Sequence, residues 1–182
     1  DYLPNLGEVL EAFRQQYPGI PLEHTSLSND EVPVQLQNGT LDAGLVMDLG
    51  GCATGLARTA LSQHTTAVMV SRSSPFWERI HISPAELDGQ TLLVPGFAPD
   101  ALAPLWQALQ ESGAHPQLEL GKQFYQVLYR TQEQNCVSLN RFEETSHSQM
   151  TNVRNVILDG LPPICAGFLR PKKQHNACAE LL

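Results

Sequence analysis

The side chains of this sequence that could do chemistry are not arranged in any familiar catalytic or metal-binding spacing. None of the six histidines falls at ligand spacing with another histidine, a cysteine or a carboxylate on one predicted helix; they are His24, His64, His81, His115, His147 and His175. No G-x-S-x-G, H-E-x-x-H or P-loop motif occurs either. We therefore predict no enzymatic activity, no metal site and no cofactor.

Three features allow a chemical interpretation that we do not favour. Cys136 could pair with a distant histidine as a nucleophile, but a buried thiol on a strand is far more common. Asp42, close to Gly44 on a predicted strand edge, fits a structural carboxylate better than a general base. The glycine-rich stretch 48–55 is not a Walker A loop, because Leu56 follows it where Lys and Ser or Thr are required. We expect a flexible connection there.

The composition is that of an ordinary globular protein. Of the 182 residues, 42% are hydrophobic and 16% are charged, which excludes an intrinsically disordered chain. The net charge is −8, and the tight basic cluster is limited to Arg170, Lys172 and Lys173, so we predict that this chain does not hold DNA by itself. No apolar run reaches the roughly 18 residues of a membrane-spanning helix.

The cysteines lack any C-x-x-C pairing; they are Cys52, Cys136, Cys165 and Cys178. Four cysteines could form two disulfides, but a chain of this size with a full core does not need them. We expect reduced thiols in a cytoplasmic protein. No signal peptide with a charged, then apolar, then small-residue pattern opens the chain.

The first part of the chain repeats one pattern of helix, turn and strand. The first helix shows a buried stripe formed by Leu3, Leu6, Leu10, Phe13 and Tyr17. Pro18 and Gly19 turn the chain, and a strand is predicted near residues 20–24. A second helix ends at Gly39, and the strand 41–46 follows. The alternation predicts parallel β-α-β units and an α/β fold.

The rest of the chain continues this alternation. Further strands are predicted at residues 65–71, 91–94, 118–120, 136–139, 156–158 and 164–169. A short helix begins at Ser83, and a longer one ends at Gly113 after presenting Leu102, Leu105, Trp106 and Leu109 on one face. Another helix carries Phe124, Val127, Leu128 and Thr131. Residues 143–152 are predicted as loop and 173–182 as a closing helix.

The start of the second helix is a candidate binding position. Ser28 and Glu31 have the spacing of a capping box, but Pro33 would then fall in the second turn, so Asp30 or Asn29 is the favoured cap. Either choice joins the end of a strand to a helix start through hydroxyl and amide side chains. Open α/β sheets bind ligands at such junctions. Plain helix capping, without any ligand, is the alternative.

Four motifs in order along the chain resemble the effector-binding domain of LysR-type transcriptional regulators. They are Leu3-Pro4, Phe13-x-x-x-Tyr17-Pro18, Leu36-x-x-Gly39-x-Leu41-Asp42, and Leu87-Asp88-Gly89 before the strand 91–94. The resemblance implies an α/β fold of two Rossmann-like lobes, similar to type 2 periplasmic binding proteins, joined by two crossover strands. Residues 1–67 with 161–182 would form one lobe, and residues 68–160 the other.

The sequence departs from this family in two respects. In residues 131–139, Gln134 and Cys136 stand where the family's V-x-x-G-x-G-I-x-L turn has glycines. The family's first strand and its N-terminal winged helix-turn-helix are not in this sequence. We therefore expect a fragment of a longer regulator, which would reach promoter DNA only through that absent domain.

The resemblance also implies a ligand site and partners. A small-molecule effector would lie in the cleft between the lobes, where the helix starts would contribute Tyr2, Ser28, Asn29, Pro95, Gly96, Phe97 and Gln123. Helix dipoles converging there would suit a carboxylate. The family further implies a homodimer. The alternative is a transporter's solute-binding protein with the same two lobes, and a third reading is an enzyme built on this scaffold.

Overall fold

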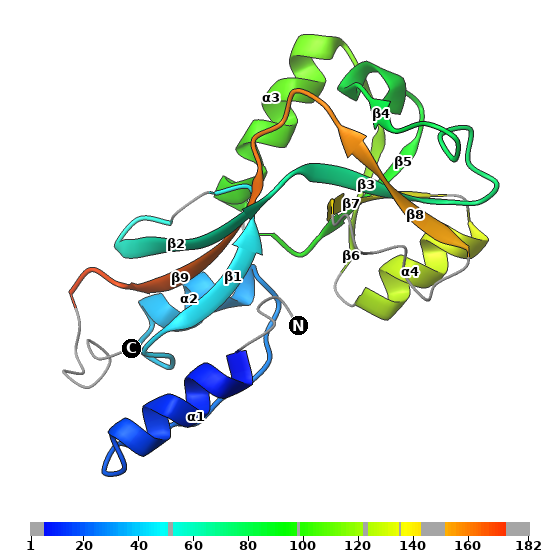
Figure 1. The fold of residues 1–182 in the computed structure, drawn as a ribbon. Helices are drawn as coiled ribbons and strands as arrows, with labels where there is room; N and C mark the ends of the chain where they lie inside the picture. The colour runs from blue at the N-terminus through cyan, green and yellow to red at the C-terminus, as the bar shows by residue number, and fades with distance from the viewer. Residues whose placement is uncertain are drawn as a thin grey trace.

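The computed structural model describes residues 6–50, 53–97, 99–121, 124–134, 136–142 and 152–173, which form two β-sheets with helices around them (Figure 1). The smaller sheet has the order β1-β9-β2, with β1 (Gly44–Asp48), β2 (Leu56–His64) and β9 (Ile164–Pro171). The larger sheet has the order β4-β8-β3-β7-β5-β6, with β3 (Thr66–Ser71), β4 (His81–Ile82), β5 (Thr91–Pro95), β6 (Gln117–Gly121), β7 (Val137–Arg141) and β8 (Val153–Leu158). These two sheets confirm the predicted α/β fold class.

We name the two halves by their sheets. The first lobe is the smaller sheet with α1 (Leu6–Gln16) and α2 (Glu31–Gln37). The second lobe is the larger sheet with α3 (Ala103–Ser112), α4 (Phe124–Glu133) and the short helical turns η1 (Pro84–Leu87) and η2 (Pro99–Leu102). The predicted residue boundaries of the lobes stay a prediction.

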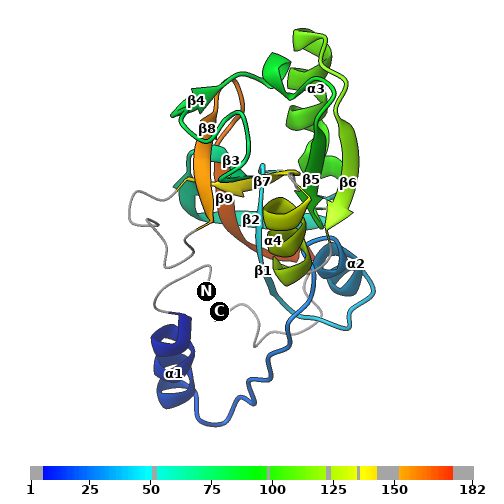
Figure 2. The same ribbon diagram turned by 90° about the vertical axis from the view of Figure 1, so that its right-hand side faces the viewer.

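The second lobe has three layers, with the larger sheet between α3 and α4 (Figure 2). Successive residues of a strand point to opposite faces. Val68 and Val70 of β3 therefore pack on the α3 side in one cluster with Leu105, whereas Met69 packs with Val127 of α4. β5 pairs in parallel with both β6 and β7, as the alternation of strands and helices predicted.

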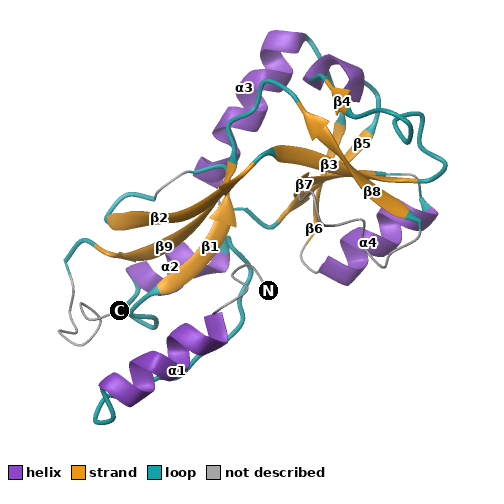
Figure 3. Cartoon of the chain, in the orientation of Figure 1, coloured by secondary structure: helices purple, strands orange, loops and turns teal. Residues whose placement is uncertain are grey.

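The first lobe does not follow the predicted parallel pattern. β1 and β2 both pair antiparallel with β9. The strand predicted at residues 20–24 is wrong, because this segment is a loop in the structure (Figure 3). The outer edge of β1 offers a physical reason. The side chain of Asn29 occupies the backbone groups of Met47 there, both as donor and as acceptor.

Two connections join the lobes. β2 runs into β3 with Thr65 between them, and residues 159–163 connect β8 to β9. The Thr66 hydroxyl donates a hydrogen bond to the carbonyl oxygen of Pro162 at 2.6 Å, which ties one connection to the other. The main apolar cluster is continuous across this junction, since Met47 and Ala166 of the first lobe share it with residues of the second. The strand β2 itself was not predicted from the sequence.

The second helix of the first lobe begins where the sequence predicts, whereas the predicted start of the first helix at Leu3-Pro4 lies outside the described residues. α2 starts at Glu31, so Asp30, one of the two favoured caps, holds the N-cap position and Pro33 stays in the first turn, but the Asp30 side chain makes no capping hydrogen bond. Val32 and Leu36 are buried against Val46 of β1. On α1, the predicted apolar stripe is only partly buried. Phe13 is covered and stacks on Tyr17 at a centroid distance of 5.0 Å.

Two helix signals of the second lobe are confirmed and one is wrong. The backbone N–H of Ser83 donates to the carboxylate of Glu86 at 2.9 Å at the start of η1. Gly113 ends α3 in the left-handed conformation, with φ 70°. Trp106 does not join the buried face of α3, because 42% of its surface is exposed. The predicted loop 143–152 falls almost wholly, and the predicted closing helix 173–182 mainly, outside the described residues.

A buried ion pair crosses the smaller sheet. The Arg58 guanidinium on β2 lies 2.8 Å from the Asp48 carboxylate on β1, and both side chains are almost fully covered. Arg58 also donates to the carbonyl oxygen of Cys165 at 2.8 Å, and the N–H of Gly50 donates to Asp48 at 2.7 Å. The guanidinium passes over Gly167 of β9, where an added Cβ would lie 2.5 Å from its Nε. The absence of a side chain at residue 167 therefore makes this pair possible.

Candidate functional site

The predicted site residues of the second lobe lie at one edge of the larger sheet. Gly96 and Phe97 follow β5, and β5 is parallel to β6 and β7. The carboxyl ends of parallel strands meet at the same edge of a sheet, and this edge is the usual ligand position in open α/β folds. Pro95 is the last residue of β5. Tyr2 and Gln123 lie outside the described residues.

The structure brings this edge against the first lobe at Gly96. The N–H of Asp30 donates a hydrogen bond to the carbonyl oxygen of Gly96 at 2.9 Å. A Cβ built on Gly96 would lie 3.0 Å from Oδ1 of Asp30 and 3.6 Å from Cβ of Ser28. Glycine at residue 96 therefore permits close approach of the two lobes. Of the predicted residues, Ser28 and Gly96 are in this way placed together.

Asn29 is held by the first lobe. Its amide nitrogen donates to the carbonyl oxygen of Met47 at 2.9 Å, and the Met47 N–H donates to Oδ1 of Asn29 at 3.2 Å. An asparagine side chain has two N–H donors and an oxygen with two lone pairs. These two bonds use one N–H and one lone pair, so the side chain keeps hydrogen-bonding capacity beyond its structural role.

Ser28 is engaged with an acidic residue. Both its N–H and its hydroxyl donate to Oε2 of Glu31, at 2.9 and 2.6 Å. The bond from the Ser28 N–H to the Glu31 carboxylate is one of the two hydrogen bonds of a capping box. The start of α2 therefore carries the carboxylates of Asp30 and Glu31, which offset the positive end of the helix dipole. The predicted dipole attraction for a carboxylate ligand is weakened at this position.

Phe97 contributes to the core rather than to an open surface. Only 6% of its surface is exposed, and it packs in the main apolar cluster with Met47 and Leu102. This cluster includes Met47, so it extends from the second lobe to β1. A ligand at this edge would therefore touch Phe97 only after some of this packing opened.

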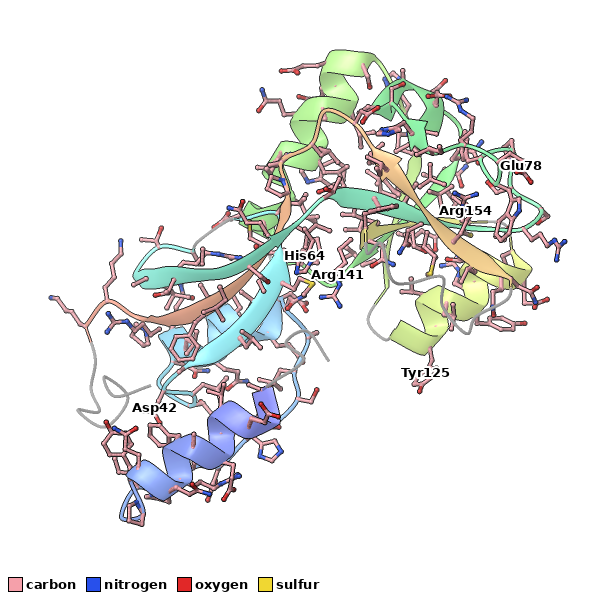
Figure 4. All side chains as sticks on the ribbon, in the orientation of Figure 1. Asp42, His64, Glu78, Tyr125, Arg141 and Arg154 are labelled. Atoms are coloured by element: carbon pink, nitrogen blue, oxygen red, sulfur yellow. The ribbon has the colours of Figure 1, made fainter. Side chains whose placement is uncertain are left out.

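Arg141 is a further residue at the junction of the two lobes, which the sequence analysis did not name. It ends β7, and its Nη1 lies 3.5 Å from the Met47 sulfur of β1, so it spans the two lobes (Figure 4). The N–H of the next residue, Phe142, donates to the carbonyl oxygen of Thr65 at 2.7 Å, which fixes the backbone at the junction. The sequence could have indicated Arg141, because it follows the predicted strand 136–139 just as Gly96 follows the predicted strand 91–94.

The ionisable groups with a shifted pKa lie in outer elements of the second lobe. The backbone N–H of Ser83 lowers the pKa of Glu86, and the Arg79 guanidinium assists. The hydrogen bond from Arg130 lowers the pKa of Glu119, and Glu119 in turn raises the pKa of Arg130. These are ordinary surface ion pairs, which contribute little to stability and indicate no general acid or base.

Metal-binding clusters and membrane-spanning helices are both absent from the described part of the chain. Within it, no group of three or more His, Cys, Asp or Glu side chains could hold a metal ion. None of the helices described here is long and apolar enough to cross a bilayer. Cys136 and Cys165 are free thiols. The other two cysteines are outside the described residues.

The family model of the LysR substrate binding domain matches residues 4–125, which is more than half of the chain. The chain belongs to the LysR substrate-binding domain family. This assignment agrees with the resemblance drawn from the sequence motifs, and it does not favour a transporter's solute-binding protein. A comparison with curated proteins gives no match.

Solved structures with the same fold are also LysR-family proteins. HinK, a LysR family transcriptional regulator from Pseudomonas aeruginosa, superimposes with a TM-score of 0.68 at 16% identity over 98% of this chain. The Synechocystis PCC6803 CcmR regulatory domain in complex with 2-PG gives 0.71 at 15% identity over 97% of this chain. The BenM effector binding domain with its effector benzoate gives 0.66 at 19% over 95%. At these identities the likeness concerns the fold.

The share of each solved chain that this chain covers differs between the matches. This LysR substrate-binding domain spans 62% of the HinK chain. It spans 86% of the CcmR regulatory domain and 80% of the BenM effector binding domain. The two-lobe fold with a shared junction is thus the fold of LysR effector-binding domains.

Proposed function

We propose that this LysR substrate-binding domain senses a small-molecule effector for a transcriptional regulator. The observation that carries the proposal is the meeting of the two lobes at Gly96, Asp30, Met47 and Arg141. The complete regulator would act in the cytoplasm as a homodimer and bind promoter DNA through a separate winged helix-turn-helix. The domain itself would have no enzymatic activity.

The effector would bind between the first lobe, residues 1–67 with 161–182, and the second, residues 68–160. The proposed contacts from the sequence are Tyr2, Ser28, Asn29, Pro95, Gly96, Phe97 and Gln123. Two proteins of the same fold have benzoate and 2-PG as ligands. A carboxylate-bearing molecule is therefore the first class of effector to test.

Effector binding would be sensed as a change in how the two lobes are arranged, because the lobes contact each other where the effector would bind. An effector can shift the balance between two lobe arrangements only by binding one of them more tightly. A preference of about 1.4 kcal/mol changes the ratio of the two arrangements tenfold. The Asp30–Gly96 hydrogen bond and the Arg141–Met47 contact would differ between these arrangements, because each joins one lobe to the other.

A thermal-shift screen against small carboxylates, aromatic acids, amino acids and sugars tests this proposal. An effector raises the melting temperature of the wild-type chain by mass action. We expect Ser28→Ala to reduce that ligand-induced rise. Ser83→Ala is a matched control, because Ser83 also donates to a glutamate three residues later but lies at η1 in the second lobe.

The outcomes separate binding from folding. Both serine variants should lower the melting temperature of the free chain by similar amounts, since both remove a side-chain bond at a helix start. A ligand-induced rise that Ser28→Ala and Ser83→Ala reduce equally would contradict the proposed position. We do not rely on Asn29→Ala, because it would also remove the partner of the Met47 backbone.

A further inference from the structure

We propose that the hydrogen bond from the Thr66 hydroxyl to Pro162, which we call the latch, holds the lobes in the arrangement that places Asp30 against Gly96. Breaking the latch would release spare residues of one connection between the lobes and let the lobes rotate relative to each other. The latch would govern the balance of lobe arrangements on which the proposed function rests, but it acts without an effector.

The two connections between the lobes differ in length. β2 continues directly into β3 as one long ribbon (Figure 1). The ladder of β2 with β9 ends at the pair His64–Ile164, and the ladder of β3 with β8 ends at the pair Ala67–Ile157. Two residues of the first connection therefore lie between these pairs, but six of the second, residues 158–163. The second connection has spare length that the first one lacks.

Thr66 closes off most of this spare length. Its hydroxyl donates to the carbonyl oxygen of Pro162 at 2.6 Å, and only 2% of the Thr66 surface is exposed. With this bond made, Pro163 alone separates the tied residue from β9, and the proline ring fixes its φ. The second connection is then hinged at one stiff residue. Because Pro162 is exposed, water can replace the hydroxyl at its carbonyl oxygen when the latch breaks.

Breaking the latch would lengthen this hinge to residues 160–163. Asp159 stays with the second lobe, because its N–H donates to the carbonyl oxygen of Ile82 at 2.9 Å. Gly160 follows in the left-handed conformation, with φ 79°, and glycine has wide conformational freedom. Leu161 packs against the main apolar cluster, which is a contact without fixed direction. A hinge consists of a few residues that absorb changes in φ and ψ, as this segment can.

The first connection would act as the pivot of the motion. The carbonyl oxygen of Thr65 accepts the N–H of Phe142 at 2.7 Å, which holds this connection to the end of β7. One short connection and one with spare length permit rotation of the lobes but not their separation. The hydrogen bond from Asp30 to Gly96 joins the lobes at another place, so a rotation would break it.

Hydrogen exchange of the whole chain without any ligand tests the latch. The reporter of lobe rotation is the N–H of Asp30, which bonds across the lobes. Two amides that bond within a lobe report on the fold itself. The N–H of Ile157 bonds within the second lobe, and the N–H of Lys172 bonds to the carbonyl oxygen of Gly55 in the first.

Four variants separate the latch from plain stability. Thr66→Val removes the hydroxyl at similar volume, and Thr66→Ser keeps a hydroxyl. Pro162→Gly gives the connection more freedom from an exposed position, so it decides alone if Thr66→Val does not fold. Thr131→Val is the matched control. Thr131 is also buried, and its hydroxyl also donates to a backbone carbonyl, that of Val127 at 2.9 Å, but within α4.

Thr66→Val should speed exchange of the Asp30 amide about three- to tenfold, the effect expected from loss of one hydrogen bond. The Ile157 and Lys172 amides should exchange as in wild type. Pro162→Gly should act in the same direction as Thr66→Val. Thr66→Ser and Thr131→Val should match wild type at Asp30.

Three outcomes would overturn the latch. Thr66→Val could speed all three amides equally, which would show that the hydroxyl supports the whole fold rather than the lobe arrangement. Exchange at Asp30 could stay unchanged in both Thr66→Val and Pro162→Gly. Thr66→Ser could speed exchange at Asp30 as much as Thr66→Val does. Each of these results leaves effector binding standing, and a thermal-shift screen without a hit leaves the latch standing.

Discussion

Asp48→Ala should destabilise the chain by about 3–5 kcal/mol, because it removes the carboxylate that faces the buried guanidinium of Arg58. Arg58 would keep its hydrogen bond to Cys165 but lose the carboxylate 2.8 Å away. Urea unfolding, monitored by fluorescence, measures the loss. Asp159→Ala is the matched control. Asp159 pairs with His81 at the surface, where both side chains are more than half exposed, and its loss should cost less than about 1 kcal/mol.

The reverse experiment separates charge burial from packing. A double substitution, Asp48→Leu with Arg58→Met, removes both charges and fills the space with apolar atoms. Replacing a buried pair in this way is often neutral or stabilising, so the double variant should recover most of the stability that Asp48→Ala loses. If Asp48→Ala costs no more than Asp159→Ala, the ion pair does not hold the smaller sheet together.

Gly44→Ala should cost about 1–3 kcal/mol, the usual penalty for an extra methyl group in a packed core. A Cβ on Gly44 would lie 2.3 Å from Cγ1 of Val32, which is buried between α2 and β1. α2 would have to move away from the sheet, and the Ser28–Asp30 segment just before it would move too. Thermal unfolding measures the loss, and the hydrogen bond from Asp30 to Gly96 connects it to the site.

A compensating substitution at Val32 tests the close packing of Gly44 against Val32. Val32→Ala in the Gly44→Ala background opens the space that the new methyl group needs, so it should destabilise less than Val32→Ala in the wild-type chain. Gly7→Ala is the control for the substitution itself. Gly7 lies on α1 with no atom within 4 Å of a built Cβ, so the change should be neutral or stabilise by up to about 1 kcal/mol. Equal effects of Gly44→Ala and Gly7→Ala would contradict the close contact.

The second lobe was largely predictable because its signals are local. Apolar runs mark β3, β5 and β7, and the helix start at Ser83 and the glycine at residue 113 mark helix ends. Each of these depends on neighbouring residues alone. The exposure of Trp106 was not predictable, because a helix pattern gives the face of a residue but not the extent of the sheet that would cover it.

The first lobe was less predictable because its pairing depends on distant segments. β2 pairs with β9 more than 100 residues later, and its sequence carries Arg58 for the buried ion pair rather than an apolar run. The segment 20–24 has the composition of a strand, but its expected place beside β1 is closed by a side chain from the next loop. A short apolar run does not show that the Asn29 side chain will occupy the backbone groups of β1 with which a strand would pair.

The effector-binding role of the predicted site residues stays a prediction, but the position of some of them can be compared with the structure. Ser28 and Gly96 stand where helix-start and strand-end patterns occur in the sequence, and the structure places them together. The sequence places Arg141 just after a predicted strand, and the parallel pairing of β5 with β7 then puts it at the same edge of the sheet as Gly96. The role of Asn29 in holding Met47 carries no sequence signal, since asparagine is common before any helix.

Hydrogen exchange of the chain with and without a bound effector tests the central claim most directly. If the effector lies between the lobes, amide protons should become protected on both of them, at Ser28–Asp30 in the first lobe and at Gly96–Phe97 and Arg141–Phe142 in the second. A ligand that binds one lobe alone would protect only one of these sets. Protection confined to a single lobe, or to elements away from the junction, would contradict effector sensing at the meeting of the two sheets.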